Sequence, residues 1–121
     1  MRIGMNKQHH DKTEELNKKC VILNMFKVGY VYIITNKNNT VLYVGVTSNL
    51  KQRILDHQNK KYKNAFSARY NCNKLVYFEC FNSIVEAIAR EKQLKAGNRN
   101  KKLALINNMN INWQDLFDSI P

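Results

Sequence analysis

The chain has 121 residues, 44% of them hydrophobic and 10% aromatic, which suits one folded domain and excludes a disordered polymer. Lys and Arg total 20 against 9 Asp and Glu, a formal charge of +11. Such a balance points to a polyanionic partner, of which nucleic acid is the commonest. No apolar stretch approaches the roughly 20 residues of a spanning helix, so we expect no membrane partner.

The N-terminal part of the chain differs from the rest. Residues 1–26 are polar and mixed in charge, so we expect a flexible extension that precedes a complete domain over 27–121. The start of the chain lacks the apolar core of a signal peptide. Three cysteines without a Cys-x-x-Cys pair favour a reducing, cytoplasmic setting over a disulfide framework.

The domain opens with a predicted β-hairpin. Residues 29–35 are β-branched and aromatic, 36–39 are an Asn-rich turn, and 40–47 form a second strand. Pairing about this turn matches residues whose numbers sum to 75, which places Tyr32 directly opposite Tyr43 on one face. Gly45 shares that face, so the face carries two phenols beside a bare patch where a ligand could approach.

Helices and one further strand follow the hairpin. In order, the pattern predicts a helix over 49–60, an irregular basic stretch over 61–73, a strand over 74–81, a helix to residue 96 and a short helix over 101–108. Ser48 caps the first helix, Asn82 or Ser83 caps the second, and Gly97 ends it. The order ββαβαα predicts an α+β domain on a small sheet.

A carboxylate interrupts the apolar stripe of the second helix. Glu91 projects between Ile84 and Ala87, where an unpaired charge is costly. Either Glu91 pairs with Lys95 at i,i+4 spacing, or it binds a divalent metal in a cleft. The pattern alone favours the pairing.

The first helix poses the same choice with cations. Arg53 and His57, four residues apart, share the side of Leu50 and Ile54. Arg53 could cover the core with its apolar stem beside an ordinary interfacial histidine. Alternatively, the guanidinium and the imidazole could both be aimed at a phosphate.

Carboxylates are scarce in the domain. Between residues 29 and 110 there are only four: Asp56, Glu79, Glu86 and Glu91. Two-metal phosphodiester chemistry needs several convergent carboxylates. If a metal binds, we therefore expect one ion on a single carboxylate, with water and phosphate oxygens filling its other positions, as suits magnesium.

These residues form an ordered series with a known parallel. Tyr30-Val31-Tyr32, then Tyr43-Val44-Gly45, then Arg53, His57 and Glu91 resemble the GIY-YIG nuclease superfamily. The closeness extends through residues 45–50 and 87–95, which suggests its small, single-domain bacterial branch. The resemblance covers roughly residues 28–117 and makes 27–121 a nuclease domain.

The resemblance implies a three-stranded antiparallel sheet flanked by helices and a metal-dependent DNA endonuclease. It implies Mg²⁺ or Mn²⁺ as the cofactor and no small-molecule cofactor. Tyr32 would be the general base or orient the attacking water, Tyr43 would bond near the scissile phosphate, and Arg53 would hold that phosphate. His57 would assist, and Glu91 would bind the metal. A supporting Asn is also expected, with Asn107 and Asn110 as the candidates.

Clustered cations suggest how nucleic acid is held. We expect backbone contacts from Lys60, Lys61, Arg69, Lys95, Arg99, Lys101 and Lys102. A solvated charged surface is the plainer interpretation for some of them. The alternative function is a binding module that holds branched or damaged DNA, or RNA, without cutting it. Nothing in the sequence specifies an oligomeric state.

Overall fold

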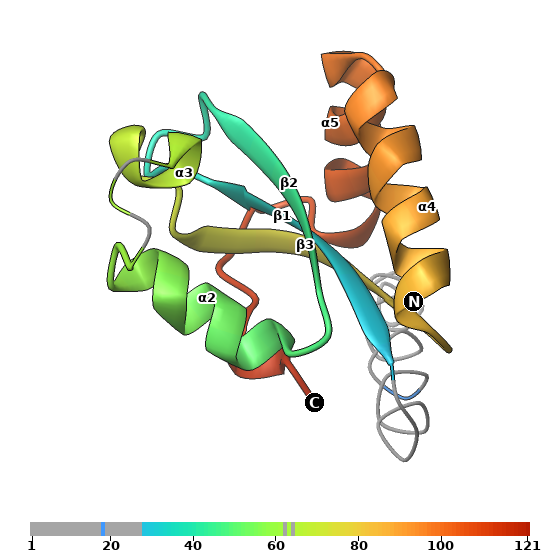
Figure 1. The fold of residues 1–121 in the computed structure, drawn as a ribbon. Coiled ribbons are helices and arrows are strands. Elements are labelled where there is room, and N and C mark those ends of the chain that lie inside the picture. The colour runs from blue at the N-terminus through green and yellow to red at the C-terminus, as the bar shows by residue number, and fades with distance from the viewer. Residues whose placement is uncertain (1–17, 19–27, 62, 64) are drawn as a thin grey trace, which may run out of the picture.

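A three-stranded antiparallel sheet forms the centre of the molecule in the computed structural model, which describes residues 18, 28–61, 63 and 65–121. The strands are β1 (Gly29–Thr35), β2 (Leu42–Thr47) and β3 (Lys74–Phe81), in the order β2-β1-β3 (Figure 1). The predicted α+β fold is therefore confirmed. The expectation for residues 1–26 falls, apart from Lys18, outside the described residues.

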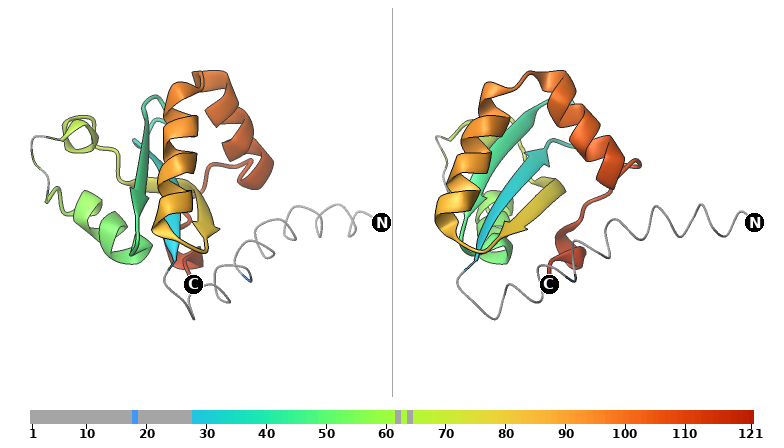
Figure 2. Two further views of the ribbon diagram at one scale, coloured as in Figure 1. Left: turned by 45° about the vertical axis from the view of Figure 1, so that its right-hand side comes forward. Right: turned by 90° about the vertical axis from the view of Figure 1, so that its right-hand side faces the viewer.

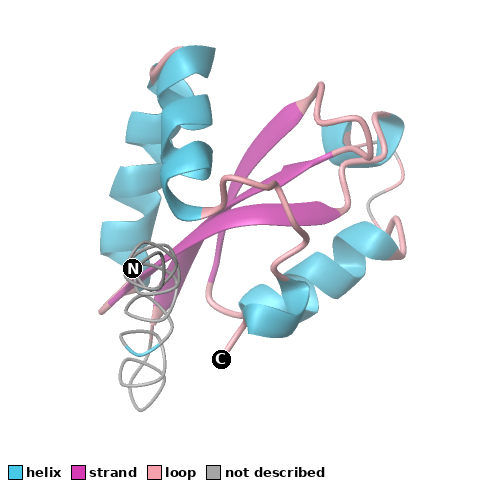
Figure 3. Ribbon diagram, turned by 180° about the vertical axis from the view of Figure 1, so that it is seen from behind, coloured by secondary structure: helices cyan, strands magenta, loops and turns pink. Residues whose placement is uncertain are grey.

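Helices cover both faces of the sheet (Figure 2). The elements are α2 (Leu50–Gln58) and α3 (Phe66–Arg69) on one face, α4 (Ile84–Ala96) and α5 (Arg99–Met109) on the other, and a 3-10 turn η1 (Phe117–Ser119) near the end. Seen from behind, the segment after α5 crosses to the α2 side (Figure 3). The Leu116 amide donates to the Leu75 carbonyl at 2.8 Å and ties this segment to β3.

The central strand β1 separates two cores. All its residues are buried, and its side chains alternate between the faces. Tyr32 and Ile34 pack towards α2, whereas Val31 and Ile33 pack towards α4. Because β1 is covered on both faces, a polar group on it, such as the Tyr32 hydroxyl, must find partners inside the protein.

The predicted register of the hairpin is wrong by two residues. Tyr32 pairs with Gly45, and Tyr43 pairs with Ile34, so the paired numbers sum to 77. The cause is the Asn36 side chain, whose Oδ1 accepts bonds from the amides of Thr40 at 2.8 Å and Val41 at 3.1 Å. These bonds lengthen the loop, and β2 begins at residue 42. A shift of two keeps every side chain on its predicted face.

Helix starts differ slightly from the predictions. Asn49, not Ser48, caps α2, accepting from the Gln52 amide at 3.2 Å. Ser83 caps α4, and Asn98 caps α5, which begins at residue 99 within the predicted basic loop. The short helix α3 lies within the stretch predicted to be irregular. Its N-cap residue, Ala65, has no side-chain group that could cap the helix.

The structure also bears on the expectations for membrane spans and for the cysteines. Within the described part of the chain, no helix is long and apolar enough to cross a membrane. Cys72 is a buried free thiol, whereas Cys80 is disulfide-bonded. The bonded Cys80 differs from the reducing setting that the cysteine spacing favours, although one bonded cysteine is not a disulfide framework.

Candidate active site

The side chain of Tyr32 lies at the centre of the candidate site. It projects from β1 with no solvent exposure, and its ring passes over Gly45 of β2. A Cβ added to Gly45 would lie 2.3 Å from both Cζ and Oη of Tyr32. The bare patch expected at Gly45 is thus filled by the protein's own tyrosine, whose buried phenol lies against the edge strand β2.

An imidazole is bonded at both nitrogens beside this phenol. His57, on α2 and buried, has Nε2 2.9 Å from Tyr32 Oη and Nδ1 3.0 Å from Ser67 Oγ. Two partners on opposite sides of the ring fix its orientation. Ser67 lies on α3 and carries no sequence signal, because nothing in the residues around it predicts a helix or a contact with residue 57.

The second phenol and the guanidinium adjoin this pair. The ring of Tyr43 lies 6.4 Å from that of Tyr32 and 5.5 Å from that of His57, centroid to centroid. Arg53, one helical turn before His57, donates from Nη1 to the Val46 carbonyl at 3.3 Å. The structure therefore brings four of the predicted site residues together from β1, β2 and α2.

The acid reaches this group from the other layer. Glu91 lies on α4, is 15% exposed, and pairs with Lys95 at 3.1 Å, so the predicted i,i+4 pair does form. Its charge also acts on Tyr32, whose pKa it helps to raise. Because α4 packs on β1 and β2 from the face opposite α2, the carboxylate acts on the phenol from the other side of the sheet.

The protonation states follow from burial. Burial raises the pKa of Tyr32 to about 12; Arg53 opposes this shift, while Tyr43 and Glu91 add to it. Burial also lowers the pKa of His57, Arg53 lowers it further, and Asp56 opposes the change. At neutral pH the phenol therefore keeps its proton and the imidazole is uncharged.

Both candidate asparagines bind the C-terminal segment. Asn110 is buried, and its Nδ2 donates to the carbonyls of Val76 at 3.2 Å and Gln114 at 2.8 Å. Asn107 accepts from the Trp113 indole at 2.7 Å. These contacts hold the chain after α5 in place. None of these hydrogen-bonding partners of the two asparagines is one of the predicted catalytic or metal-binding residues.

The predicted nucleic-acid contacts form two groups at one end of the sheet. An Arg99 bond to the Thr40 carbonyl, 3.0 Å long, ties the α4–α5 junction to the β1–β2 turn. The Asn73 amide donates to the Thr35 carbonyl and brings the α3 region to that same end. The first group, near the α4–α5 junction, consists of Arg99 with Lys95, Lys101 and Lys102, and the second, near α3, consists of Lys60, Lys61 and Arg69. Both groups therefore flank the hairpin that carries Tyr32 and Tyr43.

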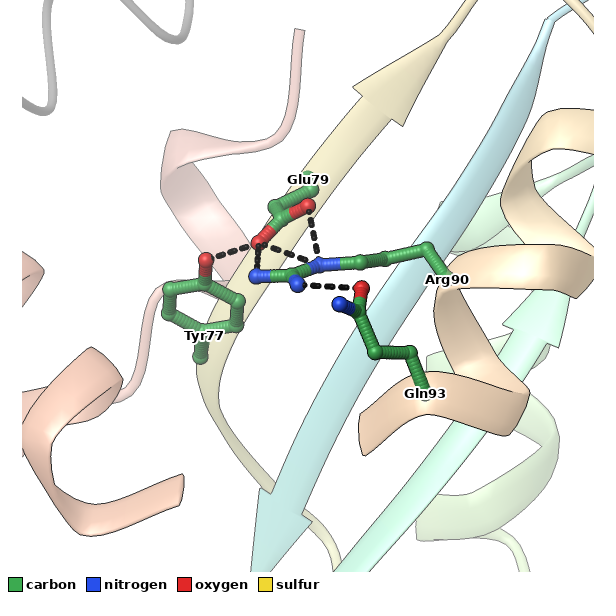
Figure 4. Close-up of polar contacts among 4 residues, drawn as sticks. All are labelled: Tyr77, Glu79, Arg90 and Gln93. Carbon is green, nitrogen blue, oxygen red and sulfur yellow. Dashed lines mark hydrogen bonds and ion pairs between the residues drawn. The ribbon is translucent and has the colours of Figure 1, made fainter. Parts of the chain in front are cut away.

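A separate polar cluster anchors α4 to β3 (Figure 4). Arg90 donates to both oxygens of Glu79, from Nε at 3.1 and 3.3 Å and from Nη2 at 3.0 Å, and from Nη1 to Gln93 at 2.7 Å. The Tyr77 hydroxyl donates to the same carboxylate. Burial raises the pKa of Tyr77, and the Glu79 carboxylate raises it further. This cluster fixes the helix that carries Glu91.

A hollow of about 650 Å³ also lies between α4 and α5. Its lining comprises Arg90, Gln93, Leu94, Gly97, Lys101, Lys102, Ala104, Leu105 and Asn108. None of the five predicted catalytic and metal-binding residues contributes, so the hollow is not part of this site.

Comparisons with known proteins identify the family of this chain. Residues 28–104 match the family model described as the GIY-YIG catalytic domain. A UPF0213 protein of Clostridium perfringens is 41% identical over 88 residues, which cover 69% of this chain and 88% of that protein. A UPF0213 protein of Staphylococcus haemolyticus is 40% identical over 81 residues, or 64% and 92% of the two chains. A solved UPF0213 structure from Bacillus halodurans is 26% identical, with a TM-score of 0.47 and coverage of 73% and 92%. The chain belongs to the GIY-YIG family.

Proposed function

We propose that the protein is a metal-dependent endonuclease that hydrolyses phosphodiester bonds in DNA. Membership of the GIY-YIG family implies a nuclease-type function. The observation that carries the proposal is the contact between Tyr32 Oη and His57 Nε2, 2.9 Å long, with Arg53 and Glu91 both near enough to shift the pKa of that phenol. Binding alone requires no such convergence of proton-transfer and anion-stabilising groups.

A relay through both rings would activate the attacking water. Tyr32 with a pKa of about 12 is a poor base by itself at neutral pH. The neutral imidazole of His57 can accept the Tyr32 proton through Nε2 as the phenol oxygen takes one from water. Ser67 bonds the other nitrogen and so keeps Nε2 directed at the phenol. Tyr32 thus passes the proton, and His57 is the base.

The guanidinium and the second phenol suit the phosphate. Attack places negative charge on the non-bridging oxygens, and preplaced donors stabilise that charge. Arg53 is held by the Val46 carbonyl through one nitrogen and also acts on the Tyr32 phenol, so its guanidinium is placed at the site where such a donor is needed. Tyr43 lies beside both Tyr32 and His57, where its hydroxyl can bond a phosphate oxygen.

Glu91 fits a cation that is held mainly by other ligands. Among the described residues, no three His, Cys, Asp or Glu side chains gather where they could hold a metal. One hard oxygen donor, partly exposed at the site, suits Mg²⁺ or Mn²⁺, because such ions keep several waters and bind phosphate oxygens. When bound, the cation would supply Lewis-acid stabilisation of the charge on the phosphate.

The test is cleavage of plasmid DNA with Mg²⁺ or Mn²⁺ by the wild type and by Glu91→Gln, Tyr32→Phe and His57→Gln. Each substitution should reduce the rate at least about 100-fold, since each removes a donor, a ligand or the base. Glu86→Gln, on the exposed side of the same helix, is the matched control and should cut at the wild-type rate. Equal cutting by all variants would contradict the proposal.

The binding-module alternative has its own signature. A protein that only holds DNA would retain DNA in EDTA and show no cleavage of duplex, branched, nicked or single-stranded DNA with either metal. That result would replace the endonuclease proposal, because the basic groups at one end of the sheet would still account for binding.

A further inference from the structure

The short helix α3 and its C-cap residue present two large aromatic side chains to solvent. Phe66 and Tyr70 are 48% and 44% exposed, and their ring centroids lie 4.7 Å apart. They are four residues apart, so one turn of helix places them on the same side. Two adjacent exposed rings at one short helix are costly in water and make this surface a candidate for contact with a ligand.

These rings continue the candidate active site outward. Phe66 stacks on Tyr43, with centroids 6.4 Å apart and planes inclined by 22°. Tyr43 in turn lies 5.5 Å from the imidazole of His57. An unbroken row of rings therefore runs from the buried imidazole to the exposed Tyr70, and a ligand on the outer rings would lie beside the site.

The surroundings of the row are cationic. Arg69 lies over the Tyr70 ring, with Cζ 5.8 Å from its centroid. Lys60, Lys61 and Lys63 precede α3, and Asp56 is the only acid between residues 56 and 74. Exposed rings among cations, next to a site suited to phosphate, fit a ligand that combines a flat π-system with negative charge. A nucleotide within a DNA strand has both.

We propose that Phe66 and Tyr70 form a stacking platform for a nucleobase adjacent to the scissile phosphate. This inference rests on the proposed function and narrows its substrate class. In a regular duplex both faces of each base are covered by neighbouring bases, so a base can lie on these rings only after leaving its stack. The platform therefore selects DNA that is unpaired beside the cleavage point.

The plainer role for these rings is to cover Tyr43 and nothing more. Packing alone predicts that their removal changes stability without changing preference among DNA forms. A stacking platform predicts a loss that falls on unpaired DNA, because stacking on a side chain is worth about 1–3 kcal/mol per base. The two roles therefore differ in a binding measurement.

The experiment measures fluorescence anisotropy in EDTA, so that no DNA is cut. The probes are a labelled oligodeoxynucleotide of about 16 nucleotides, its blunt duplex, and RNA of the same sequence. Phe66→Ala and Tyr70→Ala should each weaken single-strand binding about 5- to 150-fold and duplex binding less than about twofold. Tyr70→Phe keeps the ring and should bind as the wild type does. Ile111→Ala removes an exposed apolar side chain elsewhere and is the control.

Equal losses on single strand and duplex, no loss in either alanine variant, or a loss confined to the RNA probe would each overturn the proposal. Thermal unfolding of each variant separates a lost contact from a lost fold; if Phe66→Ala unfolds, the outer ring of Tyr70 carries the test. Cleavage is scored separately with Mg²⁺. A wild type that shows the stacking preference but never cuts would refute the endonuclease proposal and leave the platform intact.

Discussion

Gly29 and Ala87 are in contact where α4 crosses β1. A Cβ added to Gly29 would lie 2.7 Å from the Ala87 Cβ and 2.9 Å from the backbone at Ser83 and Ile84. Ala87 has no solvent exposure. The missing side chain thus sets how closely α4 packs on the sheet, and with it the position of Glu91 relative to Tyr32.

Gly29→Ala should displace α4 and reduce both stability and cleavage. The new methyl group would meet backbone atoms that cannot rotate away, and overpacking of this kind costs about 1–3 kcal/mol. Urea unfolding and plasmid cleavage measure the two effects. Gly97→Ala is the control, because a Cβ there would make only ordinary contacts of 3.5–3.6 Å. Equal stability of the two variants would show that α4 tolerates a larger separation.

Removal of Ser67 should impair turnover more than substrate binding. Ser67→Ala leaves His57 Nδ1 buried without this partner, which costs about 1–3 kcal/mol of stability. Without the Ser67 bond the imidazole is held less firmly against Tyr32, and misplacement of such a group can lower kcat by up to about 100-fold. We expect KM to change little and Ser67→Thr to restore much of the rate. Ser48→Ala, at an exposed position, should match the wild type.

Cleavage should depend on pH through His57. Because burial lowers the pKa of its imidazole below the usual 6.5, the base is neutral at pH 7 and is lost only under acidic conditions. The rate, kcat/KM, should therefore rise with pH through a midpoint below 6.5 and then reach a plateau. No fall is expected in the mildly alkaline range, since Tyr32 keeps its proton up to a pKa of about 12. A rate that rises in parallel with phenol ionisation would instead make Tyr32 itself the base.

The same imidazole should couple folding to pH. Its pKa is lower in the folded protein than the unfolded value of 6.5, so the unfolded chain binds more protons between these two values. The free energy of unfolding should therefore fall as pH drops below about 6.5. Urea titrations over this range should show a shallower fall in His57→Gln. An identical fall in both proteins would assign the effect to other groups.

Glu79→Gln should loosen α4 from β3. The substitution leaves Arg90 without its ionic partner and weakens the bond from Tyr77, and hydrogen bonds to charged groups are worth about 1.5–3 kcal/mol. We expect a lower free energy of unfolding and a partial loss of cleavage through displacement of Glu91. Glu86→Gln on the exposed surface provides the comparison for both measurements. Unchanged stability in Glu79→Gln would mean that apolar packing alone holds the helix.

The strands and the main helices could be predicted because their signals are local. The β-branched run of β1 and the Ser83 cap of α4 are properties of neighbouring residues. The hairpin register could not, because it depends on which amides the Asn36 side chain accepts from. The face shared by Tyr32 and Tyr43 was still correct, since a shift of two residues preserves it.

The residues of the candidate site could be proposed from the sequence, whereas the side chains that support them could not. The family resemblance rests on an ordered series of residues in the sequence, namely Tyr32, Tyr43, Arg53, His57 and Glu91. A single turn such as α3 is too short to show helical periodicity, so neither Ser67 nor the platform of Phe66 and Tyr70 could be placed. The contact of Ser67 with His57 exists only in the folded chain.

The bond from Arg53 to the Val46 carbonyl has a consequence for the behaviour of variants. β2 is an edge strand, and an uncovered edge invites pairing with a second molecule. Truncating Arg53 would bare a carbonyl on that edge while deleting the proposed phosphate ligand. Such a variant would tend to self-associate. Its molecular mass in solution should therefore be measured together with its cleavage activity.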